Sequence, residues 1–379
     1  MVRFRSSWVL PISGPPVRNG WVAVDRGRVI ACGSAAPSKP PEEVVAEIDL
    51  GQAAIMPGLV NAHTHLELSY LRGQVPAGSV FTDWIRSVLA ARRQYLNPNA
   101  PEILDGVDRG IAEALGCGTA LVGDISNTLV TFAPLVGSPL AAVVFHELVG
   151  FNPSDSVGLV ERAWKGIAAL GPTDRVRASL AAHAPYSVSP DVFRAIWQTL
   201  DRESSATCSV HLAESAAEVE FIRTAGGPWR PLLEELGAWN PAWVAPGVGP
   251  TEYLDGRGFL DARLLAVHGV QMTPADLSRL VARGTTLVTC PRSNLHTGAG
   301  TPPIEAFYAS GVRVAVGTDS LASTPDLNVF AELAELRTLA RSVPASRLLD
   351  SATRQGARDR KSTRLNSSHS RASRMPSSA

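Results

Sequence analysis

Histidine and carboxylate side chains recur along this chain at spacings that suit a divalent metal ion. His63 and His65 are two residues apart, so in a strand both imidazoles point to the same side and can reach one ion. His211 could supply a third nitrogen, and a buried Asp319 would need a cation, because a buried carboxylate is costly unless it is paired or metal-bound. Three imidazoles and one carboxylate leave a coordination position open for water, as catalytic metal sites do. These residues therefore predict hydrolysis by metal-activated water.

Two further groups could take part in this chemistry. Glu214 follows His211 by three residues and would reach past the metal toward a substrate. A solvated carboxylate at a helix start, favoured by the helix dipole, is the alternative for Glu214. His268 ends another apolar run, the sixth candidate strand.

The segments that must position these groups alternate between short apolar runs and helical stretches from residue 54 to residue 319. This alternation is typical of βα units and a parallel sheet. The sequence offers eight candidate strands, and eight is the number that closes a (β/α)8 barrel. The candidates are 55–63, 120–125, 141–147, 176–183, 208–214, 264–268, 286–290 and 312–319.

The chemically active side chains lie at the carboxyl ends of these predicted strands. In a (β/α)8 barrel that end is the catalytic face, so positions far apart in sequence would converge on one mouth. The residues concerned are His63, His65, His146, His183, His211, His268 and Asp319.

We expect three regions along the chain. Residues 1–53 are predicted as a small β-sandwich portion, with 20–24 and 28–32 as a hairpin. We expect its C-terminal strands to be missing, which would leave Trp21 and Val29 uncovered. Residues 54–357 are predicted as the α/β barrel, ending in helices at 328–341 and 345–355. Residues 358–379 are serine-rich and basic, and are expected to be a disordered, non-native tail; a natural disordered tail is the alternative.

Composition excludes several classes of protein. The chain is 45% hydrophobic and 18% charged, and residues 1–353 carry 28 basic and 34 acidic side chains. The mild excess of acidic side chains in residues 1–353 and the lack of a basic stripe argue against a nucleic-acid partner. No apolar run is long enough to span a membrane. The four cysteines are far apart, which indicates neither a zinc ribbon nor a disulfide framework. We expect a cytoplasmic protein with a small-molecule substrate, and a homo-oligomer is left open.

Several motifs together resemble the amidohydrolase superfamily, in the branch of cytosine deaminase-like, chlorohydrolase and adenosine-type deaminase proteins. They are residues 56–66, 183–187, 211–214, 268, 290–294 and 317–320, in the family's order. The resemblance runs from about residue 8 to residue 356. It implies metal ligation by His63, His65, His211 and Asp319. It also implies that Glu214 shuttles protons to the substrate ring and that His268 orients the water or the tetrahedral intermediate.

The lack of a lysine at the end of the fourth predicted strand indicates the number of metal ions. Binuclear members of this superfamily bridge two ions with a carboxylated lysine on strand four, but here that strand ends in His183. The lysines, Lys39, Lys165 and Lys361, fall on no predicted strand end. We therefore predict one divalent ion, zinc or alternatively iron.

The resemblance also indicates a substrate class. In related nucleoside deaminases the histidine matching His183 contacts substrate, and Trp84, Asp83, His146 and Asn294 are further candidate contacts. Trp84 could instead be a core residue, and His146 with Glu147 a supporting pair. Segments 63–69 and 83–85 look most like aminodeoxyfutalosine deaminases, of menaquinone synthesis, and 5′-modified adenosine deaminases.

The predicted reaction is hydrolytic deamination of a purine-like base or nucleoside. Asp319 takes a proton from the water, Glu214 protonates the ring nitrogen and His268 hydrogen-bonds the developing oxyanion. A chlorohydrolase, guanine deaminase or imidazolone hydrolase would need the same metal set. A non-catalytic barrel that serves as a binding module is the alternative from another class.

Overall fold

The computed structural model describes residues 1–34, 46–78, 80–202 and 207–358. Two compact units are present, Met1–Gly58 and Leu59–Arg360. The sequence analysis placed the division at 53/54, five residues earlier. Residues 35–45, which contain a Pro-rich segment at 37–43, and residues 359–379 of the predicted tail lie outside the described residues.

The first unit is built on one β-sheet of five strands in the order β3-β2-β1-β4, with β5 also pairing with β1. The predicted hairpin is confirmed, because β2 and β3 pair antiparallel around a turn in which Arg26 and Gly27 have φ of 47° and 73°. Two positive φ values are typical of a type I′ turn, which matches the twist of the flanking strands. Val29 on β3 is 47% exposed. The strands are β1 Val2–Val9, β2 Val17–Asp25, β3 Arg28–Gly33, β4 Ala46–Asp49 and β5 Ala54–Ile55.

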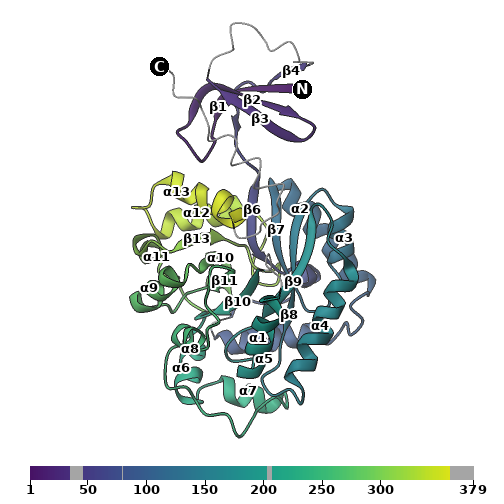
Figure 1. Cartoon of the computed structure of the whole chain (residues 1–379), viewed down its shortest axis with the longest axis vertical. Helices are drawn as coiled ribbons and strands as arrows, with labels where there is room; N and C mark the ends of the chain where they lie inside the picture. The colour runs from purple at the N-terminus through teal and green to yellow at the C-terminus, as the bar shows by residue number, and fades with distance from the viewer. Residues whose placement is uncertain (35–45, 79, 203–206, 359–379) are drawn as a thin grey trace. The chain divides into compact units, whose positions relative to one another are not determined.

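The second unit is the predicted (β/α)8 barrel. Its eight strands are parallel and follow one another in chain order around the sheet. The last strand returns to the first, where Thr64 and Asp319 form a parallel bridge. The helices lie outside the strands (Figure 1). The strands are β6 Leu59–Thr64, β7 Thr119–Ser126, β8 Ala141–Leu148, β9 Val176–Ala182, β10 Cys208–Leu212, β11 Leu264–His268, β12 Thr286–Thr289 and β13 Arg313–Val316.

Helix starts in this unit follow from capping side chains. Asp155, Ser189 and Ser215 each accept a hydrogen bond from a backbone N–H of the first turn, and Thr273 forms a capping box with Asp276. The α-helices are α1 Phe81–Arg92, α2 Pro101–Gly116, α3 Phe132–Gly137, α4 Ser156–Leu170, α5 Pro190–Leu200, α6 Ala216–Thr224, α7 Trp229–Glu235, α8 Pro250–Gly256, α9 Pro274–Arg283, α10 Pro291–His296, α11 Ile304–Ser310, α12 Val329–Leu339, α13 Ala345–Asp350 and α14 Gly356–Arg358. A 3₁₀ helix, η1 Leu66–Leu71, follows β6, and a π-helix, η2 Ser351–Gln355, follows α13.

Two apolar layers hold the barrel and fix which strand residues face its axis. The inner cluster contains Val143, Phe145 and Val267, whereas Ala142 and Val144 belong to the cluster beneath the helices. Successive residues of a strand therefore face opposite layers. Burial of these side chains is the main favourable contribution to folding. The side chains at the strand ends alternate between the two layers in the same way.

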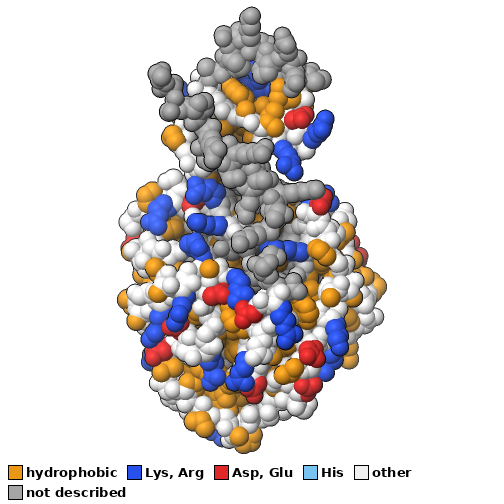
Figure 2. All heavy atoms as spheres, in the orientation of Figure 1, with side chains coloured by type: hydrophobic (Ala, Val, Ile, Leu, Met, Phe, Trp, Pro, Cys, Tyr) orange, Lys and Arg blue, Asp and Glu red, His pale blue; other side chains and the backbone are white. Residues whose placement is uncertain are grey.

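On the face shown in Figure 2, basic and acidic side chains are interspersed over the barrel unit. Among the described helices, none is both long and apolar enough to cross a membrane.

Candidate active site

Three candidate metal ligands converge where the first and last barrel strands meet. Nε2 of His65 lies 3.2 Å from Nε2 of His63. Oδ1 of Asp319 lies 3.5 Å from Nε2 of His63 and 3.3 Å from Nε2 of His65. Ligands bonded tetrahedrally at 2.0–2.2 Å from one ion are separated by about 3.3 to 3.6 Å. The observed spacing is thus that of ligands sharing a small cation.

His211 brings a third imidazole to this group. Its Nδ1 lies 2.9 Å from the backbone oxygen of His183, which fixes the ring so that Nε2 is the free nitrogen. Ligand atoms of His63, His211 and His268 all lie within 4.8 Å of one another. Burial lowers the pKa of His63, and that of His65 to about 3, so both rings are neutral and offer lone pairs at neutral pH.

Asp319 is held by the protein on its other oxygen. Ser293 and Ser323 donate to Oδ2 at 2.5 and 3.0 Å, which leaves Oδ1 turned to the histidines. These neighbouring imidazoles hold the pKa of Asp319 well below its ordinary value, although burial acts in the opposite direction. Asp319 has φ of 61°, a conformation that costs a non-glycine residue energy and recurs at functional sites.

The donor set fits one divalent ion. Neutral imidazole nitrogens and a carboxylate oxygen are ligands that zinc and iron accept, and a cluster of acceptors this close needs a cation between them. His63, His65, His211 and Asp319 would hold it.

Glu214 lies beside this centre on a turn supported by a second carboxylate. Glu218 accepts the backbone N–H of Ala213 at 2.9 Å and that of Glu214 at 2.8 Å. Burial raises the pKa of Glu214 well above its ordinary value, and the carboxylates of Asp319 and Glu218 act in the same direction. This shift favours the protonated carboxyl, the form that can act as an acid.

His268 faces the same space from the end of β11. Its Nε2 lies 3.5 Å from Oε1 of Glu214, and Nδ2 of Asn294 lies 3.0 Å from its Nδ1. In this arrangement Asn294 donates to Nδ1, so Nε2 carries the hydrogen of the neutral ring. Burial lowers the pKa of His268 well below its ordinary value, which keeps the ring neutral. His268 can thus donate a hydrogen bond to an oxygen above the metal centre.

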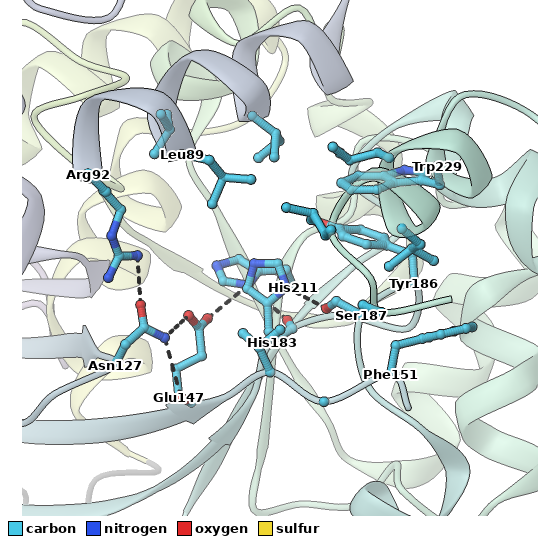
Figure 3. A pocket seen from close by; sticks show the side chains of 18 of the residues that line it. Leu89, Arg92, Asn127, Glu147, Phe151, His183, Tyr186, Ser187, His211 and Trp229 are labelled. Carbon is cyan, nitrogen blue, oxygen red and sulfur yellow. Dashed lines mark hydrogen bonds and ion pairs between the residues drawn. The ribbon is translucent and has the colours of Figure 1, made fainter. Parts of the chain in front are cut away.

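A cavity of about 510 Å³ opens over these groups. Its lining includes the chemical groups His65, His183, His211, Glu214, His268 and Asp319. Much of the remaining wall is apolar and comes from α1 and α7, including Trp84, Leu89 and Trp229. The ring of Trp229 stacks on Tyr186 with centroids 3.6 Å apart (Figure 3). The volume suits a ligand larger than a free base.

Two of the predicted substrate contacts line this cavity. His183 lies in its floor, with Nδ1 2.6 Å from Oγ of Ser187, so that Nε2 is left for a ligand. Trp84 belongs to the wall formed by α1.

Asp83, His146 and Asn294 have other positions and do not line the cavity. Asp83 is 70% exposed and pairs with Arg86, because one residue along a helix turns the side chain away from the face of Trp84. His146 faces the layer beneath the helices, and its Nε2 contacts the backbone oxygen of Asn127 at 3.1 Å. Asn294 supports His268 from behind. In this geometry Asn294 supports His268, whereas Asp83 forms an ion pair at the surface.

Polar residues that the sequence analysis did not select as substrate contacts also line the cavity, among them Arg92, Asn127 and Glu147. Strand alternation could have identified Glu147, because it shares its side of β8 with the inward-facing Val143 and Phe145. No comparable signal was available for Arg92 and Asn127, which lie at the end of a helix and just after a strand.

The fold and the site define a (β/α)8 hydrolase built around a metal centre at the carboxyl ends of its strands. Comparison with known proteins agrees, since the model of the Amidohydrolase family matches residues 54–361. The chain belongs to the amidohydrolase family.

Similar proteins are deaminases by name. The chain is 34% identical over 319 residues to an aminodeoxyfutalosine deaminase of Deinococcus radiodurans, with 81% of this chain and 73% of the relative covered. It is 31% identical over 358 residues to a 5-methylthioadenosine/S-adenosylhomocysteine deaminase of Nitratidesulfovibrio vulgaris, covering 90% and 74%. An adenosine deaminase of Xanthomonas campestris with bound zinc has a TM-score of 0.78 at 27% identity, covering 94% and 79%. These names favour an enzyme over the non-catalytic binding module.

Proposed function

We propose that this chain hydrolyses the exocyclic amine from the adenine ring of a nucleoside, with one zinc ion as its cofactor. The observation that carries the proposal is the meeting of four potential ligands, His63, His65, His211 and Asp319, with a buried acid, Glu214, beside them. The names of the relatives supply the substrate class. Aminodeoxyfutalosine is the first candidate, which would give the enzyme a place in menaquinone synthesis, and 5′-methylthioadenosine is the second. A cytoplasmic location belongs to the same proposal.

His63, His65, His211 and Asp319 would hold the zinc ion, which when bound would supply a water activated for attack near neutral pH. The protein groups around it divide the proton transfers. Asp319 is ionised and can accept a proton, while the protonated Glu214 donates one to the ring nitrogen next to the amine-bearing carbon. His268 donates a hydrogen bond to the oxygen on which negative charge develops.

His183 and the apolar walls position the ring for this chemistry. His183 lies next to His211, with ring centroids 5.1 Å apart, and its free Nε2 can hydrogen-bond the base. The apolar wall would limit the access of water to a bound ring, which would strengthen the electrostatic interactions in the site.

The test measures metal content and ammonia release together. Metal-replete protein should contain about one ion per chain and release ammonia from adenosine analogues. Asp319→Asn should lower metal content sharply and abolish turnover, whereas Asp83→Asn, at an exposed position outside the cavity, should change neither. A content of two ions would contradict the single zinc site, and no turnover of any amino-substituted heterocycle would contradict deamination.

A further inference from the structure

Helix α10 holds two of the groups that the proposed reaction uses. Ser293 donates to Oδ2 of Asp319 at 2.5 Å, and Nδ2 of Asn294 lies 3.0 Å from Nδ1 of His268. The two supporting residues are adjacent and buried in this helix of six residues. Any movement of α10 would therefore disturb Asp319 and His268 together.

The start of α10 lacks a cap of its own. Its N-cap residue is Cys290, whose side chain makes no capping hydrogen bond, and Pro291 has no N–H. The backbone N–H of Arg292 is one of the first-turn donors that find no acceptor within a helix. A donor of this kind is costly when it is buried without a partner. The helix therefore depends on an acceptor from elsewhere in the fold.

Glu332, in the first turn of α12, supplies that acceptor. Its Oε2 accepts the backbone N–H of Arg292 at 3.2 Å. The guanidinium of Arg292 donates two hydrogen bonds to Asp326, just before α12, at 2.8 and 3.1 Å. Both connections run from one residue of α10 to the same neighbouring segment, so this segment fixes where α10 begins.

Stability alone does not account for Glu332. Its side chain is 0% exposed, and among the described residues its Oε1 has no hydrogen-bond partner and lies 3.6 Å from Nη1 of Arg292. The charge of Arg292 is already paired with Asp326. A buried carboxylate in an ion pair is often no more stabilising than an apolar side chain of similar size. What this carboxylate adds is a fixed acceptor for one backbone N–H.

The site needs the precision that such an acceptor provides. Distances from ligand atoms to an ion are fixed to about 0.2 Å, and a displacement of about 1 Å at a reacting group can lower a rate by about 100-fold. Ser293 and Asn294 follow Arg292 directly along the chain. The position of the Arg292 N–H therefore sets the positions of both supporting side chains.

We propose that Glu332 is a positioning residue for catalysis. By accepting the N–H of Arg292 it fixes α10, and through this helix it fixes the orientations of Asp319 and His268. This proposal rests on the proposed function, because it takes Asp319 and His268 to be catalytic. Glu332 lies outside the described cavity lining, so it acts on the reaction through these two residues.

The test compares two substitutions that differ in the acceptor. Glu332→Met removes the acceptor at nearly constant volume, whereas Glu332→Gln keeps a carbonyl oxygen for the N–H of Arg292. In Glu332→Met, zinc affinity measured by competition with a chelator should fall about 10-fold, as when groups that orient a metal ligand are changed. At saturating zinc, kcat for ammonia release from 5′-methylthioadenosine should also fall about 10-fold with KM unchanged. Glu332→Gln should keep both quantities near their parental values.

Two further variants serve as controls. Glu335→Met is the matched one, because Glu335 lies three residues further along α12 and its charge also acts on Arg292. This variant should leave zinc affinity and kcat unchanged. The double variant of Glu332→Met with Asn294→Ala separates positioning from general destabilisation. Glu332→Met should slow Asn294→Ala by less than it slows the parent enzyme, because both changes act on His268 through the same helix.

Parental zinc affinity and kcat in Glu332→Met would overturn the proposal, even if the melting temperature fell. Equal losses in Glu332→Met and Glu332→Gln would also overturn it, because the charge and not the acceptor would then matter. So would effects of Glu332→Met and Asn294→Ala on kcat that multiply. If no amino-substituted heterocycle releases ammonia, the proposed function is contradicted, and zinc affinity still decides the role of Glu332. If Glu332→Met does not fold, Glu332→Asp replaces it, since the shorter side chain withdraws the acceptor from Arg292.

Discussion

Gly317 is the position at which one added methyl group should disturb the metal centre most directly. A Cβ built there would lie 2.7 Å from the backbone oxygen of His63 and 2.8 Å from its Cβ. Ordinary contacts between such atoms begin near 3.4 Å, so the two chain segments must separate by about 0.6 Å or more. These segments carry His63 and Asp319, whose bonds to an ion tolerate changes of only about 0.2 Å.

We therefore expect Gly317→Ala to lower the stability by about 1 to 3 kcal/mol, as overpacking of a core does. We also expect zinc affinity to fall by about 10- to 100-fold, as it does when groups supporting a ligand are changed. Thermal melting and competition with a fluorescent chelator measure the two effects. Gly166→Ala is the matched control, since that glycine is exposed in α4 with nothing within 4 Å, and alanine should stabilise the helix slightly. A Gly317→Ala protein with parental zinc affinity and melting temperature would refute this reasoning.

Two further predictions concern groups around the centre. Asn294→Ala should lower kcat by about 10-fold or more with little change in KM. The reason is that the Asn294 amide donates to Nδ1 of His268, which keeps the proton of His268 on Nε2, and lies outside the cavity lining. A rise in KM alone would instead indicate that Asn294 contacts the substrate. Burial raises the pKa of Asp124 to about 7, so the folded state keeps a proton that the unfolded chain has lost. The free energy of unfolding should therefore fall as pH rises from about 4 to about 7, by at most about 4 kcal/mol. In urea unfolding, Asp124→Asn should reduce this dependence of stability on pH. An unchanged pH dependence would show that Asp124 is not its source.

The barrel was predictable because its signals are local and repeated. Apolar runs alternating with helical stretches gave all eight strands, and the polar ends of these runs indicated the catalytic face. Predicted and observed strands differ at their ends. For example, the strand expected at 208–214 is β10 Cys208–Leu212, since Ala213 already has φ of 52°. Nothing in the sequence marks a non-glycine residue for that conformation.

Substrate contacts were harder to predict because they depend on which face of an element meets the cavity. Trp84 and Asp83 are adjacent in sequence, yet only Trp84 lines the cavity, because the packing of α1 sets its rotation. The same holds for His146 and Glu147, where strand alternation turns the histidine outward. Residue type alone led to His146 as a candidate substrate contact. The structure instead places the neighbouring carboxylate, Glu147, in the cavity lining.

The contacts that hold the proposed metal ligands come from the protein itself. Ser293 and Ser323 fix one oxygen of Asp319, and Gly317 permits the close approach of His63. The backbone oxygen of His183 orients His211. Acceptors gathered within 3.2 to 3.5 Å of one another repel, and a positive φ at Asp319 adds a cost of about 1 to 3 kcal/mol. The surrounding barrel holds these residues in place, so the free energy of folding offsets this cost. The ligands are therefore already arranged before a cation binds.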